Sequence, residues 1–137
     1  MRAEQGKRPI IRVEQVMAQN YAMIDGLATI QEAIDLFRLE SAALLIVNKR
    51  HDDDEYGLVL LSDIAKQVVA RDRSPERVNV YEVMAKPVIA VDPSMDVRYC
   101  ARLFERFGLS LAPVIEHQAV VGVVSYDGIV LEGLLGT

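Results

Sequence analysis

Cysteine is almost absent from this chain, and so are long hydrophobic runs. A single cysteine, Cys100, cannot form an intrachain disulfide, and nothing indicates an oxidising compartment. The longest apolar run, residues 42–47, is far shorter than the ~20 residues that span a bilayer. Residues 1–12 lack the apolar stretch of a secretory signal. These absences predict a cytoplasmic location and no membrane segment.

Positive charge is also scarce. The formal net charge is −5, and no basic block occurs beyond Arg2, Lys7 and Arg8. A nucleic-acid-binding surface needs clustered lysine and arginine, so we expect no nucleic-acid partner. Because no arrangement of serine, histidine, cysteine or clustered carboxylates typical of catalysis emerges, we do not expect an enzyme. With 137 residues, 51% hydrophobic and 26% charged, the chain fits one compact globular module.

What the chain does contain is an internal repeat. Residues recur identically at an offset of 67 positions, which then falls to 65 so that Gly57 aligns with Gly122. Units of about 60 residues seldom bury enough surface to be stable alone. We therefore expect two repeats, residues 13–71 and 80–135, to pack on each other with the functional crevice between them. The recurring residues of the first copy are Val13, Val16, Met17, Ala18, Asp25, Leu36, Phe37, Leu44 and Val47.

Apolar spacing predicts the same helix in both repeats. Thr29 and Glu32 form a capping-box pair at the start of a stripe of apolar residues with helical spacing. This pattern predicts a helix over residues 30–40. Its counterpart, behind the N-cap residue Asp96, covers residues 97–107.

Short apolar runs on either side of polar loops predict a hairpin in each repeat, followed by a final helix. The runs are residues 44–47 and 57–61 in the first repeat, and residues 111–115 and 120–124 in the second. With a first strand before each helix, the predicted fold class is α+β: two pseudo-twofold-related βαββα units packed as one compact module.

These features together resemble a tandem pair of CBS domains, named after cystathionine beta-synthase. A Val-Met pair opens each unit, a strand ends in aspartate, and a glycine with two apolar residues precedes Ser/Thr and Asp; the matching segments are 16–64 and 83–129. The resemblance implies a stand-alone regulatory CBS pair that senses an adenine nucleotide in the cleft between repeats and signals to an unknown protein partner. It implies AMP, ADP, ATP or S-adenosylmethionine as the ligand and no required cofactor.

The family's ligand signature is Gly-x-x-Ser/Thr-x-x-Asp, whose carboxylate accepts hydrogen bonds from the ribose hydroxyls. The first repeat keeps Gly57 and Asp63, with Leu60 in place of the hydroxyl residue. We expect Asp63 to be the main ribose ligand. The alternative is that Asp63 is a solvated or helix-capping carboxylate.

The second repeat departs further from the signature. Ser125 has the expected spacing, but Gly128 occupies the acidic position and Asp127 falls one residue early. One residue on a helix rotates a side chain by about 100°. A solvated or capping carboxylate is therefore the favoured interpretation of Asp127. Ser125 and Asp127 remain candidate nucleotide-binding residues, with a weak or empty second site as the alternative.

The resemblance also implies where the rest of a nucleotide would lie. Adenine would lie beside the first strand of each repeat, which includes Met23, Ile24 and Val88. The candidate phosphate ligands are Lys86, Arg98 and Arg102, for which a solvated helix face is the alternative.

Three further features carry structural expectations. The acidic run 51–55 is expected to be the solvated tip of a hairpin, and Cys100 a small buried residue. Apolar residues on the final helices predict a homodimer, and a ligand-free dimerisation or interaction scaffold is the alternative function. The residues of these helices are Ile64, Val68, Val69, Ile129, Val130, Leu134 and Leu135.

Overall fold

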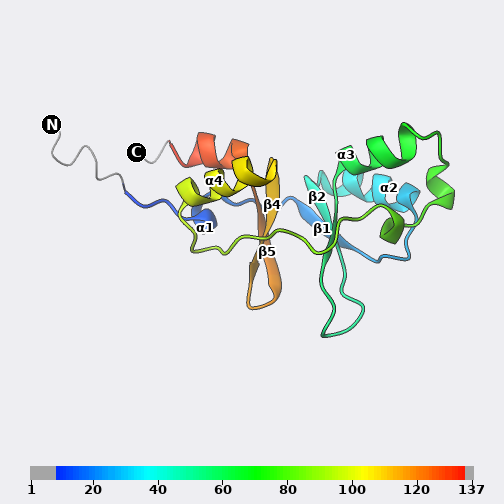
Figure 1. Cartoon of the computed structure of the whole chain (residues 1–137), viewed down its shortest axis with the longest axis horizontal. Coiled ribbons are helices and arrows are strands. Elements are labelled where there is room, and N and C mark those ends of the chain that lie inside the picture. The colour runs from blue at the N-terminus through cyan, green and yellow to red at the C-terminus, as the bar shows by residue number, and fades with distance from the viewer. Residues whose placement is uncertain (1–8, 135–137) are drawn as a thin grey trace. The chain divides into compact units, whose positions relative to one another are not determined.

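The computed structural model describes residues 9–134 and divides the chain into two compact units (Figure 1). The first, here called the continuous unit, is Asn20–Val88. The second, here called the split unit, combines the residues before Asn20 with those after Val88. Leu135, which ends the predicted second repeat, lies outside the described residues.

The continuous unit is built on a three-stranded sheet with the order β1-β2-β3. Strands β1 and β2 are parallel, whereas β2 and β3 form an antiparallel hairpin. In Figure 1 the loop between β2 and β3 is a long arm that extends beyond the sheet. The elements are β1 (Tyr21–Ile24), α2 (Ile30–Glu40), β2 (Leu44–Val47), β3 (Gly57–Val59), α3 (Leu61–Ile64), the π-helix η2 (Ala65–Val69) and the 3-10 helices η3 (Pro75–Arg77) and η4 (Val80–Glu82).

Helix α2 begins where the capping box predicts. The backbone N–H of Glu32 donates to Thr29 Oγ1 over 3.1 Å, and the Thr29 N–H donates to the Glu32 carboxylate over 2.8 Å. These two bonds satisfy helix N–H groups that have no partner inside the helix. The buried face of the helix carries Ile30, Ala33 and Phe37. The prediction for residues 30–40 is therefore confirmed.

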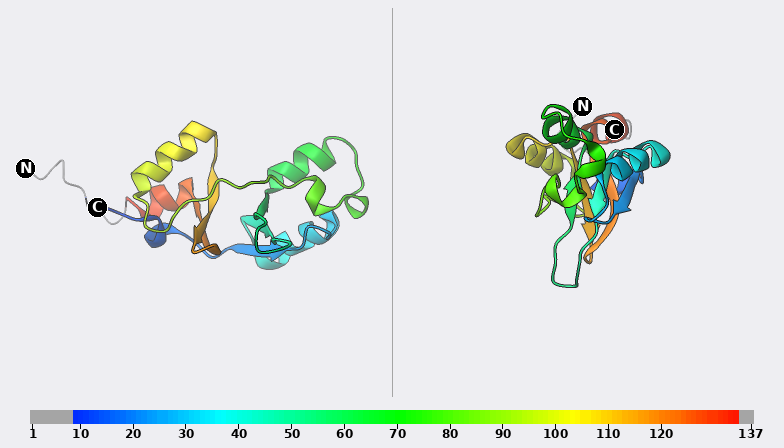
Figure 2. Two further views of the ribbon diagram at one scale, coloured as in Figure 1. Left: turned by 60° about the horizontal axis from the view of Figure 1, so that its bottom comes forward. Right: turned by 90° about the vertical axis from the view of Figure 1, so that its right-hand side faces the viewer.

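The split unit contains α1 (Val13–Val16), α4 (Val97–Phe107), β4 (Leu111–Glu116), β5 (Ala119–Ser125) and the π-helix η5 (Gly128–Glu132). Strands β4 and β5 pair antiparallel, and Figures 1 and 2 show α4 and η5 on the same side of this hairpin. The N-cap residue Asp96 accepts the Arg98 N–H over 2.9 Å, so helix 97–107 is also confirmed. Both hairpins lie where the sequence predicts them, except that β3 ends at Val59 instead of residue 61, because α3 begins at Leu61.

One predicted strand is reduced to a single bridge. The second repeat should open with a counterpart of β1, but Val91 alone pairs with Val114, in parallel. Its N–H donates to the Pro113 carbonyl, and its own carbonyl accepts from Ile115. Pro113 stands at the position of Ile46, whose N–H belongs to the ladder between β1 and β2. Because proline has no N–H, the ladder cannot continue toward Ile89.

The opening segment of each repeat packs with the body of the other repeat. Leu58 and Ala85 exchange two backbone hydrogen bonds of 2.9 Å, and Ala18 and Val123 exchange the equivalent pair, of 2.8 and 2.9 Å. A Cβ on Gly57 would lie 2.6 Å from the sulfur of Met84, and a Cβ on Gly122 would lie 2.7 Å from that of Met17. Glycine is needed at both positions because the methionine of the opening segment lies directly on the strand.

Each hydrophobic core also includes residues from the opening segment of the other repeat. The core of the continuous unit includes Val78, Val80 and Val83, and that of the split unit includes Val13 and Val16. Packing units and sequence repeats therefore have different boundaries.

Several predicted surface and core residues can now be placed. Cys100 is fully buried, as expected, and burial raises the pKa of its thiol to about 11. The apolar set of the final helices needs correction: Ile64, Val68 and Ile129 belong to the cores, because they face the sheets of their own units. Exposed apolar side chains on these helices are Leu61, Val69, Val130 and Leu131, and the exposed Leu134 lies in the turn after η5. In residues 9–134, no helix is long and apolar enough to cross a membrane.

Candidate functional site

The continuous unit contains a cleft of about 650 Å³, here called the carboxyl-end cleft. It lies where the parallel strands β1 and β2 end and β3 begins, at the base of the long hairpin loop. Its volume lies within the roughly 300–1,000 Å³ of small-molecule sites. Its lining residues are Asp25, Gly26, Leu27, Val47, Asn48, Lys49, Arg50, Asp54, Gly57, Tyr81, Met84 and Lys86.

An ion-paired network occupies the polar end of this cleft. Lys86 Nζ lies 2.6 Å from Asp54 Oδ1, and the Arg50 N–H donates to Asp54 Oδ2 over 2.9 Å. Arg50 Nε lies 3.5 Å from the same oxygen. The hydrogen bond from Lys86 and those from the backbone hold the pKa of Asp54 well below its usual range. Asp54 therefore stays ionised and joins the hairpin loop to Lys86.

The acidic run is only partly the solvated tip that the sequence predicts. His51, Asp52, Asp53 and Glu55 are exposed, as expected. The side chain of Asp54 is only 9% exposed, because it turns toward Lys86. That contact joins residues 32 positions apart, and local sequence carries no signal for it.

The remaining wall of the carboxyl-end cleft combines apolar and polar groups. Tyr81 and Leu27 are exposed there, and Met84 is partly buried over Gly57. Asp25 Oδ1 accepts the Leu27 N–H over 2.8 Å, which fixes the turn after β1. The sequence indicated Asp25 only through its recurrence as Asp92. The structure gives both residues the same role, because Asp92 accepts the equivalent hydrogen bond from the Ser94 N–H over 2.8 Å.

Asp63, the predicted ribose ligand, lies outside this cleft. Its Oδ2 accepts the Leu60 N–H over 2.9 Å at the start of α3, and the side chain is half-buried. This is the capping geometry named as the alternative. Gly57, the other residue of the signature, lines the carboxyl-end cleft at the start of β3. The structure therefore separates the two signature residues along the length of β3.

In the second repeat, Ser125 and Gly128 of the signature make local structural contacts. The Gly128 N–H donates to Ser125 Oγ over 3.1 Å, so the serine hydroxyl caps the final helix. A Cβ on Gly128 would lie 2.8 Å from the Val16 carbonyl oxygen, which explains the glycine at the acidic position. Asp127 is exposed, and its side chain makes no capping hydrogen bond.

The other predicted ligands are dispersed. Of the three candidate cations, only Lys86 lines the carboxyl-end cleft, and Met23, Ile24 and Val88 do not line it. Arg102 lies over the Tyr99 ring, 5.4 Å from its centroid.

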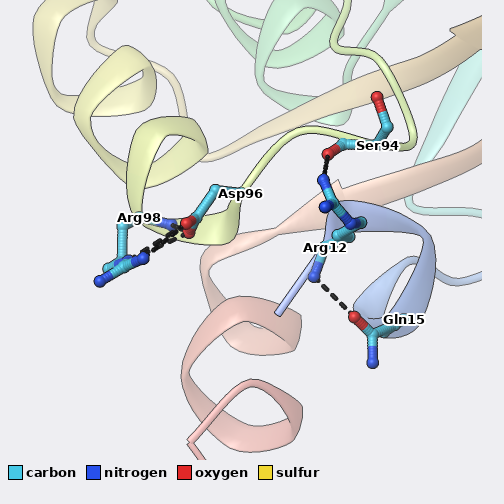
Figure 3. A network of polar contacts seen from close by, with 5 residues as sticks. All are labelled: Arg12, Gln15, Ser94, Asp96 and Arg98. Carbon is cyan, nitrogen blue, oxygen red and sulfur yellow. Dashed lines mark hydrogen bonds and ion pairs between the residues drawn. The ribbon is translucent and has the colours of Figure 1, made fainter. Parts of the chain in front are cut away.

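Arg98 makes a bidentate pair with Asp96 at the start of α4, through Nε to Oδ1 and Nη2 to Oδ2 (Figure 3). This pair holds the pKa of Asp96 below its usual range. Arg12 lies beside the pair and donates to the Ser94 carbonyl over 2.6 Å. The network joins the first described residues to α4, since Arg12 and Asp96 also form a backbone bridge. Within the described residues, no group of three or more histidine, cysteine or acidic side chains could hold a metal ion.

Comparison with known proteins identifies the family. The CBS-domain family model matches residues 80–133. A hexameric CBS-CP12 protein from bloom-forming cyanobacteria is 36% identical, with a TM-score of 0.86, over 90% of this chain and 71% of that one. This chain belongs to the CBS-domain family. Its fold is that of a CBS pair.

Other solved CBS structures agree with this fold. A conserved CBS-domain protein of unknown function from Thermoplasma acidophilum is 26% identical, with a TM-score of 0.77, over 88% of this chain and 68% of that one. The CBS pair of protein MJ0100, solved with 5-methylthioadenosine and S-adenosyl-L-methionine, is 22% identical over 93% of this chain and 98% of that one, with a TM-score of 0.76. That similarity shows the fold alone. No curated protein matches the chain.

Proposed function

We propose that this CBS pair is a regulatory module that binds an adenosine compound and signals its occupancy to a protein partner. The compound belongs to the class of AMP, ADP, ATP and S-adenosylmethionine. The observation that carries the proposal is the Asp63 carboxylate, which stands at the family spacing from Gly57 and is held by the Leu60 N–H. The adenosine ligands of the MJ0100 pair support the choice of ligand class. The lone buried Cys100 supports a cytoplasmic location.

The fixed carboxylate suits a ribose. One hydrogen bond to Asp63 Oδ2 leaves acceptor capacity on both oxygens, because an ionised carboxylate offers about four lone-pair sites. The bond from Leu60 also restricts the rotamer of Asp63, so less side-chain entropy is lost when a ligand binds. Two ribose hydroxyls can then donate to one carboxylate.

The test is a thermal-shift titration of the whole chain with AMP, ADP, ATP and S-adenosylmethionine. A ligand at a hundredfold its dissociation constant stabilises the native state by about 2.7 kcal/mol, or several degrees in melting temperature. Asp63→Asn keeps an oxygen for the Leu60 N–H but removes the charge. We expect it to weaken binding by about 1.5–3 kcal/mol, whereas the matched Asp127→Asn should change it little. Absence of a shift with all four ligands at millimolar concentration would refute the proposal.

A ligand-free scaffold is the second candidate, and two observations favour it. The Val16 carbonyl leaves no room for an acidic side chain at position 128, and the CBS-CP12 protein is a hexamer. The exposed Val130 and Leu131 on η5, with Leu134 in the turn after it, are suited to contact a second copy. Two results together would favour the scaffold. Light scattering would show a multimer that Val130→Glu dissociates, and none of the four ligands would shift the melting temperature. We propose the homodimer for either function, because the exposed apolar residues are the same in both cases.

A further inference from the structure

We propose that the carboxyl-end cleft is a second ligand site, for a small phosphorylated molecule that carries an aromatic ring, as nucleotides do. Lys49, Arg50 and Lys86 would bind the phosphate groups, and Tyr81 the ring. This site goes beyond the proposed function, because Asp63 does not line it.

The first argument is charge. Three cations and two carboxylates, Asp25 and Asp54, line the cleft, which leaves it with one net positive charge in a chain whose net charge is −5. The exposed acidic tip of the same loop does not line the cleft. An anion is therefore attracted to this part of a generally acidic protein.

The second argument is the donor capacity of the cations. Lys86 uses one of three ammonium protons on Asp54, and its side chain is 24% exposed. Arg50 contacts Asp54 only through Nε at 3.5 Å, and its side chain is 81% exposed. The forked guanidinium thus keeps the N–H groups that bind phosphate oxygens in pairs. Lys49 lies 4.9 Å from the centroid of the Tyr56 ring, an interaction that leaves its ammonium protons for an anion.

The third argument is preorganisation. Asp54 contacts both Arg50 and Lys86, so the two cations lie close together before any ligand arrives. Without the carboxylate they would repel each other and separate. Asp54 is accordingly a positioning residue for Lys86, because the 2.6 Å contact reduces the freedom of that side chain before a phosphate arrives.

The fourth argument is the apolar wall. Tyr81 lines the cleft and is 52% exposed, so its ring is accessible to a ligand. Its ring, with Leu27 and Met84 in the same lining, offers a face on which a planar base can stack. Asp25 Oδ2 can accept a hydroxyl proton, since only Oδ1 is used by the Leu27 N–H. Phosphate, hydroxyl and ring thus each have a matching group.

The experiment is isothermal titration calorimetry of the whole chain with three probes: ATP, inorganic tripolyphosphate and adenosine. We expect ATP to bind most tightly, tripolyphosphate more weakly, and both to weaken with added salt. Arg50→Gln should weaken both phosphate probes at least tenfold. Tyr81→Ala should weaken ATP but leave tripolyphosphate unchanged. Arg38→Gln is the matched control: it removes the same charge from an exposed position of the same unit and should change nothing.

The outcomes separate this site from Asp63. If Asp63→Asn removes ATP binding while Arg50→Gln and Lys86→Gln leave it intact, the cleft site is wrong and the proposed function stands. If the cation variants alone weaken ATP, the cleft site stands and the role of Asp63 is wrong. Failure of ATP and tripolyphosphate to bind at millimolar concentration overturns the cleft site, and so does equal weakening by Arg38→Gln. If Lys86→Gln fails to fold, the titrations with Arg50→Gln decide, because the Arg50 side chain is exposed.

Discussion

Individual residues explain why the two repeats have diverged at their signatures. Gly57 and Gly122 are kept because a methionine lies on each of them. Gly128 is required by a closer and less adaptable contact, since its neighbour is the backbone carbonyl of Val16 and not a flexible side chain. The acidic residue of the family pattern is therefore excluded from the second repeat by packing.

Substitution of Gly128 by alanine should destabilise the fold. Alanine normally gains about 1 kcal/mol over glycine in a helix. Here its Cβ would lie 2.8 Å from the Val16 oxygen, and overpacking of this kind costs about 1–3 kcal/mol. We expect a net loss of up to about 2 kcal/mol in the free energy of unfolding, measured with urea, and a larger loss for Gly128→Asp.

Gly26→Ala is the control for this measurement. A Cβ on Gly26 would lie 3.5 Å from its nearest neighbour, Val47 Cγ1, which is ordinary contact. We expect a change within about 0.5 kcal/mol, the usual size at a position without strain. A Gly128→Ala variant as stable as the wild type would show that the Val16 carbonyl can move.

At the scale of elements, one proline explains why the two sheets differ in their number of paired strands. β1 forms a parallel ladder of four residue pairs with β2, whereas its counterpart forms one bridge at Val91. Pro113→Ala supplies the missing N–H opposite Ile89. We expect the new amide at position 113 to exchange its hydrogen at least tenfold more slowly than an open amide. The stability should change by no more than about 1 kcal/mol, because one hydrogen bond is gained and some packing is lost.

Hydrogen exchange followed by NMR provides the measurement, with the Ile115 amide as the internal reference. That amide already donates to the Val91 carbonyl over 3.0 Å. Exchange at position 113 as fast as in an unfolded peptide would mean that another cause shortens the ladder.

Elements governed by neighbouring residues could be read from the sequence. Helices α2 and α4 and both hairpins follow from spacing and caps, which act within a few positions along the chain. The reduced strand at Val91 was missed because its cause, Pro113, lies on the partner strand. Most of the candidate site was missed because it also depends on a contact between residues far apart in the sequence: Asp54 and Lys86 are separated by 32 positions. Gly57 and Lys86 were found because the family resemblance pointed to them.

At the scale of the whole molecule, the opening segment of each repeat belongs to the packing unit that contains the body of the other repeat. Val78, Val80 and Val83 follow the first repeat in sequence but are at most 2% exposed in the core of the continuous unit. Full burial of such a side chain contributes about 1.5–3 kcal/mol. A repeat isolated at its sequence boundaries would lose all three, although a small domain has only about 5–15 kcal/mol of net stability.

The fragments 20–88 and 13–71 test this directly. The fragment 20–88 contains the entire continuous unit, including the Leu58–Ala85 bridge and Met84 over Gly57. It should unfold cooperatively by circular dichroism on heating. The fragment 13–71 keeps the sequence repeat but lacks Val78, Val80 and Val83, and should show no cooperative transition. The opposite result, a folded 13–71 and an unfolded 20–88, would show that the opening segments contribute little. Stability would then follow the sequence repeat instead of the packing unit.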